Sequence, residues 1–240
     1  MKIRIKFRKW GSTKFIGHLD MLRFFQKAMR RADIDICYSE GFSPHQIMSF
    51  AAPLGVGVTS DGEYFDIEVH STKSTQESLA AINATLVDGV EVTGYVKLPD
   101  NAKTAMSIVT AADYFLSFKK EEANPFTKEE WDNKLQDVFW NSPTFTIIKK
   151  TKKSEREIDL KPLVYDLKTE DRNGVFGFYI CVSTGSVDNI KPELVLASLY
   201  EKLGFVYPES AIAIHRLDTY ATDESTGKRI SLLDMGVEIK

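Results

Sequence analysis

The chain has 240 residues, of which 43% are hydrophobic and 27% are charged, and its formal net charge is −3. These proportions are ordinary for a soluble globular protein, and the longest apolar runs fall far short of the ~20 residues that a membrane span needs. The two cysteines, Cys37 and Cys181, lie far apart and form no zinc or iron–sulfur pattern. We therefore expect a cytoplasmic protein with no metal, no cofactor of its own and no membrane association.

The first part of the chain predicts the order strand, helix, strand, strand, helix, strand. Lys2–Lys9 alternates charged and apolar residues with a period of two, which is typical of a half-buried strand. In the next segment Leu22, Phe25, Ala28 and Met29 recur with helical spacing. We expect strands at 2–9, 47–51, 63–70 and 90–98, and helices at 19–32 and 77–86.

After residues 100–107 a similar order starts again, with one added strand. We expect strands at 108–118, 144–150, 156–160, 176–182 and 211–217, and helices at 128–140 and 192–203. The order βαββαβ is that of a ferredoxin-like domain. The sequence therefore predicts an α+β protein with two tandem ferredoxin-like (βαββαβ) domains, at 1–99 and 108–220, followed by a tail at 221–240. A single continuous α+β sheet is the alternative.

Positive charge is concentrated at the start of the chain. The first 31 residues carry ten basic side chains and a single acidic one, Asp20. The other 209 residues hold 21 basic and 33 acidic groups. Such an asymmetry favours a polyanionic partner, and RNA is the first to consider.

Two rows of cations are the candidates for contacts with RNA phosphates. One row occupies a single face of the first strand: Lys2, Arg4, Lys6 and Arg8. The other row occupies a polar face of the following helix: Arg23, Lys27, Arg30 and Arg31. We predict that these eight residues bind RNA with an affinity that falls as salt rises. The alternative for the strand is a face that meets solvent or is covered by the acidic remainder of the chain.

The segment 38–45 combines aromatic residues with loop formers. Gly41 and Pro44 favour a fixed loop, while Tyr38 and Phe42 offer ring faces on which bases stack. We predict that Tyr38 and Phe42 contact RNA; the alternative is a structural loop with Phe42 in the core. A basic group at 149–156 is a further candidate for RNA contact, although charge runs in hairpin loops are usually only solvated.

His18 and His45 are candidates for a general acid–base in RNA cleavage, because an imidazole titrates near neutral pH. The alternative role for His18 is a helix cap or a hydrogen-bond donor, and the alternative for His45 is a place in a structural loop. The sequence holds no HExxH motif and no Ser/His/Asp spacing typical of a catalytic triad. Whether the chain is an enzyme stays open, and we favour the absence of an intrinsic activity.

Four segments stand out: Phe15-Ile-Gly-His-Leu-Asp20, Arg30-Arg31-Ala32, Tyr38-Ser-Glu-Gly-Phe-Ser-Pro-His45 and Ser49-Phe-Ala-Ala-Pro-Leu-Gly55. Together with the weaker segments 158–162 and 191–193, and His215-Arg216, they resemble the radical SAM-linked protein family. That family is a domain of unknown function fused to or encoded beside cobalamin-binding radical-SAM proteins. The chain has Gln46 where the family commonly has a second proline, and it has no CxxxCxxC motif. The resemblance implies a stand-alone partner of a radical-SAM enzyme.

Our main hypothesis is therefore an RNA-binding accessory protein that acts with a radical-SAM enzyme on tRNA or rRNA. One alternative is a metal-independent endoribonuclease that uses His18 or His45. The other is a scaffold that binds the radical-SAM partner without RNA.

Overall fold

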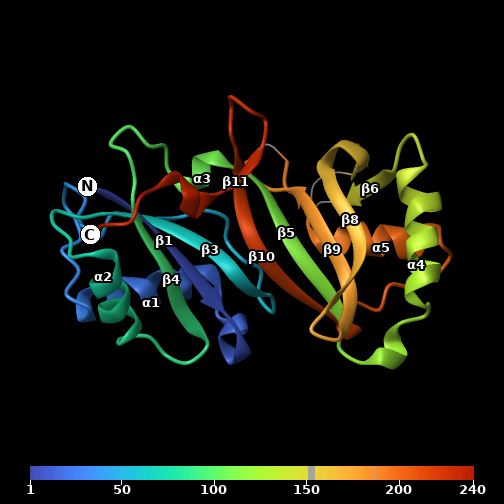
Figure 1. Cartoon of the computed structure of the whole chain (residues 1–240), viewed down its shortest axis with the longest axis horizontal. Helices are drawn as coiled ribbons and strands as arrows, with labels where there is room; N and C mark the ends of the chain where they lie inside the picture. Colours follow the sequence, from blue (N-terminus) through green and yellow to red (C-terminus); the bar gives the residue numbers. More distant parts are fainter. Residues whose placement is uncertain (151–154, 187) are drawn as a thin grey trace. The chain divides into compact units, whose positions relative to one another are not determined.

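The computed structural model describes residues 1–150, 155–186 and 188–240 (Figure 1). The chain divides into two compact units: unit 1 contains residues 1–111 and 216–240, and unit 2 contains residues 112–215. The structure is mixed α/β, with mostly antiparallel strand pairing and several helices, whereas the tandem ferredoxin-like arrangement stays a prediction. Over the residues described, no helix is long and apolar enough to cross a membrane.

Unit 1 begins with six elements in the predicted order: β1 (Lys2–Lys9), α1 (His18–Arg31), β2 (Met48–Phe50), β3 (Thr59–Glu68), α2 (Thr75–Asn83) and β4 (Val90–Lys97). Strand β1 lies between β3 and β4 and is antiparallel to both, and β2 pairs with β3. Unit 1 also contains α3 (Ala105–Ile108), β10 (Ile212–Thr222) in part, and β11 (Arg229–Ser231). Strand β11 pairs with β10, and both β10 and β5 (Val109–Phe118) run from one unit into the other.

The last residues of the chain belong to unit 1. Val237 and Lys97 exchange two backbone hydrogen bonds, of 2.8 and 2.9 Å. The Ile239 amide donates to the Thr75 hydroxyl at 2.9 Å. The two units thus differ from the predicted domains at 1–99 and 108–220 with a separate tail at 221–240, because these contacts attach the tail to β4 and α2.

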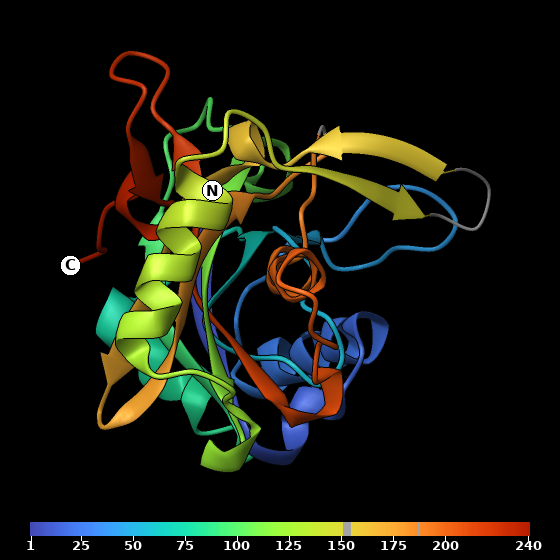
Figure 2. The same cartoon turned by 90° about the vertical axis from the view of Figure 1, so that its right-hand side faces the viewer.

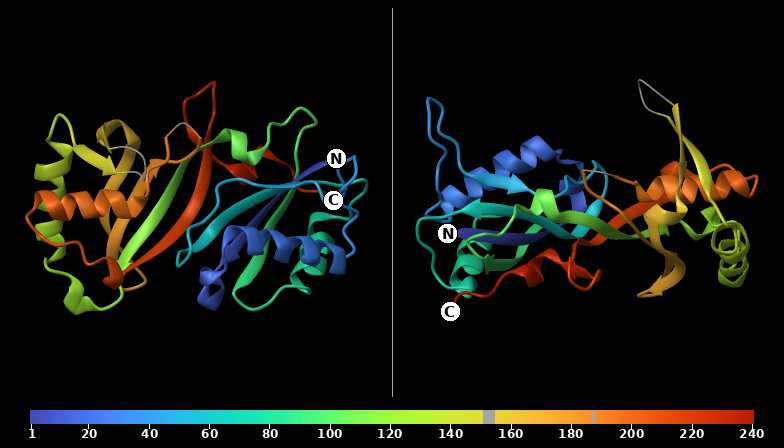
Figure 3. Two further views of the ribbon diagram at one scale, coloured as in Figure 1. Left: turned by 180° about the vertical axis from the view of Figure 1, so that it is seen from behind. Right: turned by 90° about the horizontal axis from the view of Figure 1, so that it is seen from above.

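The apolar face of β1 is buried, as its alternation predicts. Ile3, Ile5 and Phe7 pack against α1, where the Phe25 ring lies 4.7 Å from the Phe7 ring, centroid to centroid. Figure 3 shows α1, in blue, on this side of the sheet and the red C-terminal segment on the other side. Burial of each such side chain contributes roughly 1.5–3 kcal/mol. The apolar face of β1 thus determines which side of the strands α1 covers.

Arg4, on the other face of β1, is buried. Its side chain is 1% exposed, and its guanidinium donates to both carboxylate oxygens of Asp66 on β3, at 2.8 and 3.0 Å. It also donates to the Leu232 carbonyl at 3.3 Å and to the Lys103 carbonyl at 3.4 Å. The buried charge is therefore neutralised and its donors have acceptors within unit 1.

The next two cations of this face also have acidic partners. The Lys6 ammonium lies 3.0 Å from the Asp218 carboxylate of β10. Arg8 is exposed and pairs with Asp61 at 2.8 Å and with Glu91 at 3.4 Å. The hydrogen bond to Asp61 raises the pKa of the Arg8 guanidinium above its usual range. Acidic side chains thus neutralise three of the four cations on this face, and of these three only Arg4 is buried.

Unit 2 packs two helices against three strands. Helix α4 (Lys128–Lys134) continues as a π-helical segment (Leu135–Trp140), and α5 (Pro192–Lys202) follows β9 (Val175–Ser183). Strand β9 lies between β5 and β8 (Val164–Arg172). Strands β6 (Thr146–Lys150) and β7 (Glu155–Asp159) form a hairpin of their own (Figure 2). The predicted basic group at 149–156 falls on this hairpin, and its residues 151–154 lie outside the described residues.

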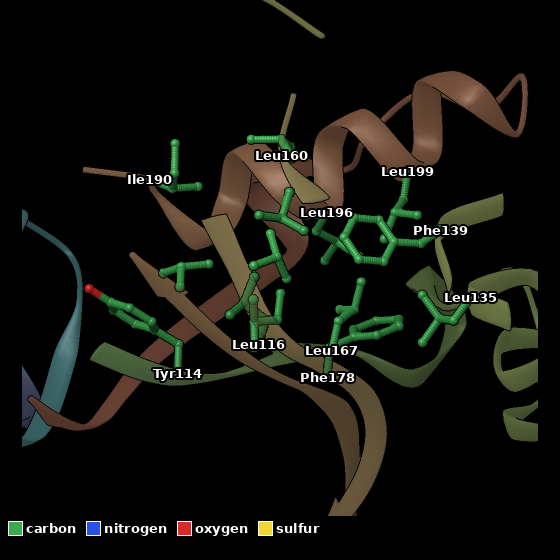
Figure 4. Close-up of a cluster of buried hydrophobic side chains, with 14 of the residues drawn as sticks. Tyr114, Leu116, Leu135, Phe139, Leu160, Leu167, Phe178, Ile190, Leu196 and Leu199 are labelled. Carbon is green, nitrogen blue, oxygen red and sulfur yellow. The ribbon is translucent and has the colours of Figure 1, made fainter. Parts of the chain in front are cut away.

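The core of unit 2 gathers large side chains from its helices and strands (Figure 4). The Trp131 and Phe178 rings stand edge to face with centroids 4.9 Å apart. Lys161 donates to the carbonyls of Phe139 at 2.9 Å and Trp140 at 3.0 Å, at the end of the π-helical segment. This lysine satisfies backbone acceptors that the helix end leaves open. Lys161 lies in the segment 158–162, which contributes to the family resemblance, and its role there is structural.

We expect Asp66→Asn to destabilise the protein by about 3–5 kcal/mol, because the buried Arg4 guanidinium would lose its carboxylate partner. Asp61→Asn removes an exposed partner of Arg8 and should cost at most about 1 kcal/mol. Urea unfolding followed by circular dichroism measures both values. Equal stability of the two variants would contradict a special role for the buried pair.

Candidate nucleic-acid interface

The four predicted RNA-binding cations on β1 have partners inside the protein. Arg4, Lys6 and Arg8 take part in the ion pairs described above, and the Lys2 ammonium donates to the Ala102 carbonyl at 2.9 Å. A phosphate would have to displace Asp66 and the C-terminal segment to reach Arg4. Because these four cations have partners within the protein, we place the candidate surface on α1, and the phosphate track on β1 stays a prediction.

Helix α1 carries the other four predicted cations on its solvent side. Its buried side consists of Met21, Phe25, Ala28 and Met29. Its exposed side carries Arg23, Lys27, Arg30 and Arg31. Residues three and four apart on a helix are neighbours, so these side chains form one row. Arg23 pairs with Asp20 at 3.3 Å, whereas Lys27, Arg30 and Arg31 form no ion pair within residues 1–150, 155–186 and 188–240.

Helix α1 ends in a Schellman motif with an aspartate in the left-handed position. The Ile34 amide donates to the Met29 carbonyl at 3.1 Å, and the Asp33 amide donates to the Arg30 carbonyl at 3.3 Å. Asp33 has a φ of 55°, a conformation that glycine and asparagine adopt most readily. The motif turns the chain sharply, directly after the last cations of the helix.

The loop 38–46 is held against α1 and leaves Phe42 in solvent. Tyr38 and Gln46 form an isolated antiparallel bridge, and the Gln46 side-chain amide donates to the Gln26 carbonyl of α1 at 3.2 Å. Tyr38 is about half exposed and Phe42 is fully exposed. Phe42 therefore does not fill the core, which was the alternative for this loop. Its ring is open to a stacking partner.

A hollow of about 610 Å³ lies where the end of α1, the segment 32–38 and the turn 71–73 meet. Its wall includes two predicted residues, Arg30 and Tyr38, and three residues that the sequence reasoning missed: Asp33, Asp35 and Lys73. The missed residues come from separate segments, and no spacing in the sequence joins them. The sequence pattern that could have indicated this hollow is the pair Asp33 and Asp35 directly after a basic helix.

His18 and His45 lie in different surroundings. The His18 ring stands edge-on to Phe50 with centroids 5.3 Å apart, whereas His45 Nδ1 lies 2.8 Å from the Ser39 hydroxyl in the loop. They line two different hollows, so the structure does not pair them as acid and base. The endoribonuclease hypothesis stays a prediction. In the part of the chain that the structure describes, no cluster of three or more His, Cys, Asp or Glu residues could hold a metal ion.

A second buried ion pair, between Arg216 and Glu63, also contacts the segment 49–55. The Arg216 guanidinium donates to the Glu63 carboxylate and to the Ala52 carbonyl, both at 2.9 Å. Burial raises the pKa of Glu63, against the opposing effect of Arg216, and burial lowers the pKa of Lys9 near it. The hollow beside this cluster holds only about 20 Å³. These charges are therefore enclosed and serve the fold of unit 1, since no ligand larger than a water fits.

The chain belongs to a family described as uncharacterized proteins conserved in bacteria (DUF2344), whose model matches residues 2–192. A comparison with curated proteins finds no match. One similar solved structure is a Cbf5–Nop10–Gar1 complex, with 8% identity and a TM-score of 0.46, covering 93% of this chain and 51% of that one. This chain thus spans about half of that relative. Another is an unknown protein from Galdieria sulphuraria, with 11% identity and a TM-score of 0.23, covering 90% of this chain and 96% of that one. With TM-scores this low, neither likeness bears on function.

We expect Asp33→Ala to lower the free energy of unfolding by about 1 kcal/mol, because alanine is strained at the left-handed position. Asp33→Asn should stay within about 0.5 kcal/mol of the natural protein, since asparagine tolerates this conformation. Urea unfolding gives both values. An alanine variant as stable as the asparagine variant would contradict a constraint at this turn.

Proposed function

We propose that this protein binds RNA through the exposed side of α1 together with the loop 38–46. The proposal rests on two observations: Lys27, Arg30 and Arg31 have no acidic partner among the described residues, and the Phe42 ring is fully exposed on a loop that Gln46 joins to α1. Cations that contact phosphates and aromatic rings that stack on bases are the two components of single-strand binding.

The aromatic residues favour RNA over an acidic protein as the partner. Cations alone would serve either partner, but the rings of Tyr38 and Phe42 add surfaces for unstacked bases. The loop that carries them is tied to α1 by the bond from Gln46 to Gln26. Little conformational entropy is then lost when a base stacks, which favours binding.

We further propose that the protein acts with a radical-SAM enzyme on tRNA or rRNA. The support is the family resemblance carried by the segments 15–20, 38–45 and 49–55. The chain has two cysteines, fewer than the three that a CxxxCxxC motif supplies to an iron–sulfur cluster. The reaction would therefore belong to the partner, and this chain would hold the RNA.

The combined change Lys27→Gln, Arg30→Gln and Arg31→Gln tests the phosphate contacts. Each lost contact should reduce the slope of log affinity against log salt by about 0.7, so the triple variant should lose about 2 in slope. Fluorescence anisotropy of a labelled single-stranded RNA, measured over a series of salt concentrations, gives the slope. The affinity at low salt should fall as well.

A matched control removes three exposed lysines from other parts of unit 1: Lys97→Gln, Lys228→Gln and Lys240→Gln. The change in net charge is the same, so a general electrostatic effect would weaken RNA binding equally in both triple variants. Retention of the natural slope in the α1 variant would remove α1 from the interface.

Phe42→Ala tests base stacking separately from charge. Loss of one stacked ring should weaken single-strand binding by about 1–3 kcal/mol, or roughly 5- to 150-fold, while the salt slope stays the same. Phe42→Tyr keeps the ring and should bind like the natural protein. If alanine and tyrosine variants bind equally well, Phe42 does not contact a base.

The alternatives give different results in the same assays. Failure of the natural protein to bind any RNA, together with its capture by a radical-SAM enzyme, would favour the protein-only scaffold. RNA cleavage that is lost in His18→Ala or His45→Ala would establish the endoribonuclease.

A further inference from the structure

The hollow at the end of α1 differs in charge from the helix face beside it. The face carries four cations and one acidic residue, Asp20, whereas the wall of the hollow balances Arg30 and Lys73 against Asp33 and Asp35. Carboxylates repel phosphate groups at short range. The hollow therefore suits a ligand that offers N–H donors to the carboxylates while its phosphate remains near the cations.

The hollow has the size and the wall of a site for a single nucleotide. Its volume of about 610 Å³ lies within the range of small-molecule sites. Tyr38 forms part of the wall, and its hydroxyl accepts a hydrogen bond from the Gln46 amide at 3.4 Å. Tyr38 can therefore act as a fixed platform for a base. Arg30 belongs both to the row on α1 and to the hollow, so an RNA strand on the helix leads directly into it.

The two carboxylates of the hollow are not equivalent. Asp35 accepts a hydrogen bond from the Ser71 hydroxyl at 2.7 Å. The Asp33 carboxylate is exposed and has no hydrogen-bond or ion-pair partner among the residues described. An ionised carboxylate offers two acceptor oxygens and no donor. Asp33 is therefore the group that is free to accept two hydrogen bonds from a base.

Guanine is the base that matches such a carboxylate. Its Watson–Crick edge presents two adjacent donors, N1–H and the 2-amino group, which fit the two oxygens in a fork. Adenine and cytosine place a donor beside an acceptor on this edge, and uracil places one donor between two acceptors. Each of these three bases would set an acceptor against a carboxylate oxygen.

We infer that the hollow receives one unstacked guanosine of the bound RNA, with Asp33 on its Watson–Crick edge, Tyr38 against its ring and Arg30 on its phosphate. The inference rests on the RNA-binding function proposed above. It makes Asp33 the residue that determines specificity, while the row on α1 supplies affinity for RNA of any sequence.

Labelled uridine oligonucleotides with one central substitution test this inference. The natural protein should bind the guanosine oligonucleotide about 10-fold more tightly than those with adenosine, cytidine or uridine. Inosine differs from guanosine only by the missing 2-amino group and should lose most of this preference. Equal binding of all the oligonucleotides would overturn the guanine site and leave the RNA-binding function intact. Absence of any RNA binding would overturn both.

Asp33→Asn tests whether Asp33 is responsible for the preference for guanosine. Asparagine has the same shape and tolerates the left-handed turn, but it replaces one acceptor by a donor, so the preference for guanosine should fall to within about 2-fold. The salt slope should not fall, because no cation is lost. Asp88→Asn, which neutralises an exposed aspartate elsewhere in unit 1, is the control and should keep the preference. A preference for guanosine that survives in Asp33→Asn would place base recognition elsewhere.

Discussion

The buried ion pair between Arg4 and Asp66 joins segments of unit 1 that are far apart in the sequence. It links β1 to β3, and Asp66 also accepts a hydrogen bond from the Ala105 amide at the start of α3, at 2.7 Å. Arg4 donates in addition to the Leu232 carbonyl in the C-terminal segment. A buried charge without its partner costs several kcal/mol. The strands, α3 and the C-terminal segment therefore have to assemble together, and unit 1 is complete only with residues from both ends of the chain.

This constraint divides the cations at the start of the chain into two groups. The cations of β1 are oriented by the strand alternation toward acidic residues of β3, β4 and β10, where they stabilise the fold. The apolar side of α1 covers the opposite face of the same strands. The cations of α1 are on the other side of the helix and therefore meet solvent. The positive charge of the first 31 residues is thus partly structural, and the row on α1 is the part that we propose as the binding surface.

Local periodicity predicted the elements of unit 1 well, because a strand or helix leaves its period in the sequence. The alternation in Lys2–Lys9 correctly predicts the buried face of β1, and the stripe through Phe25 and Met29 correctly predicts the buried side of α1. Periodicity does not reveal what lies opposite a charged face, since Asp66 and Asp218 approach β1 only through the tertiary fold. For the same reason the C-terminal residues were expected to form a separate tail.

The candidate site, too, could be predicted only in part from the sequence. The exposed cations of α1 follow from the helical pattern, and the aromatic loop follows from its composition. The hollow does not, because Asp33 and Lys73 are brought together by a Schellman turn and by the turn before α2. Asp33 itself stands where glycine is the usual residue, so a rule of local structure would have marked the position as a turn and not as a binding group.

Gln46 makes the helix and the loop a single surface. Its side-chain amide donates to the Gln26 carbonyl on α1 and to the Tyr38 hydroxyl on the wall of the hollow. In this chain the two bonds hold the Tyr38 ring at a constant place relative to α1, whose last turn carries Arg30. In the proposed complex, a phosphate on the helix and a base against the ring would meet groups that are already in position, so binding would not have to order the loop.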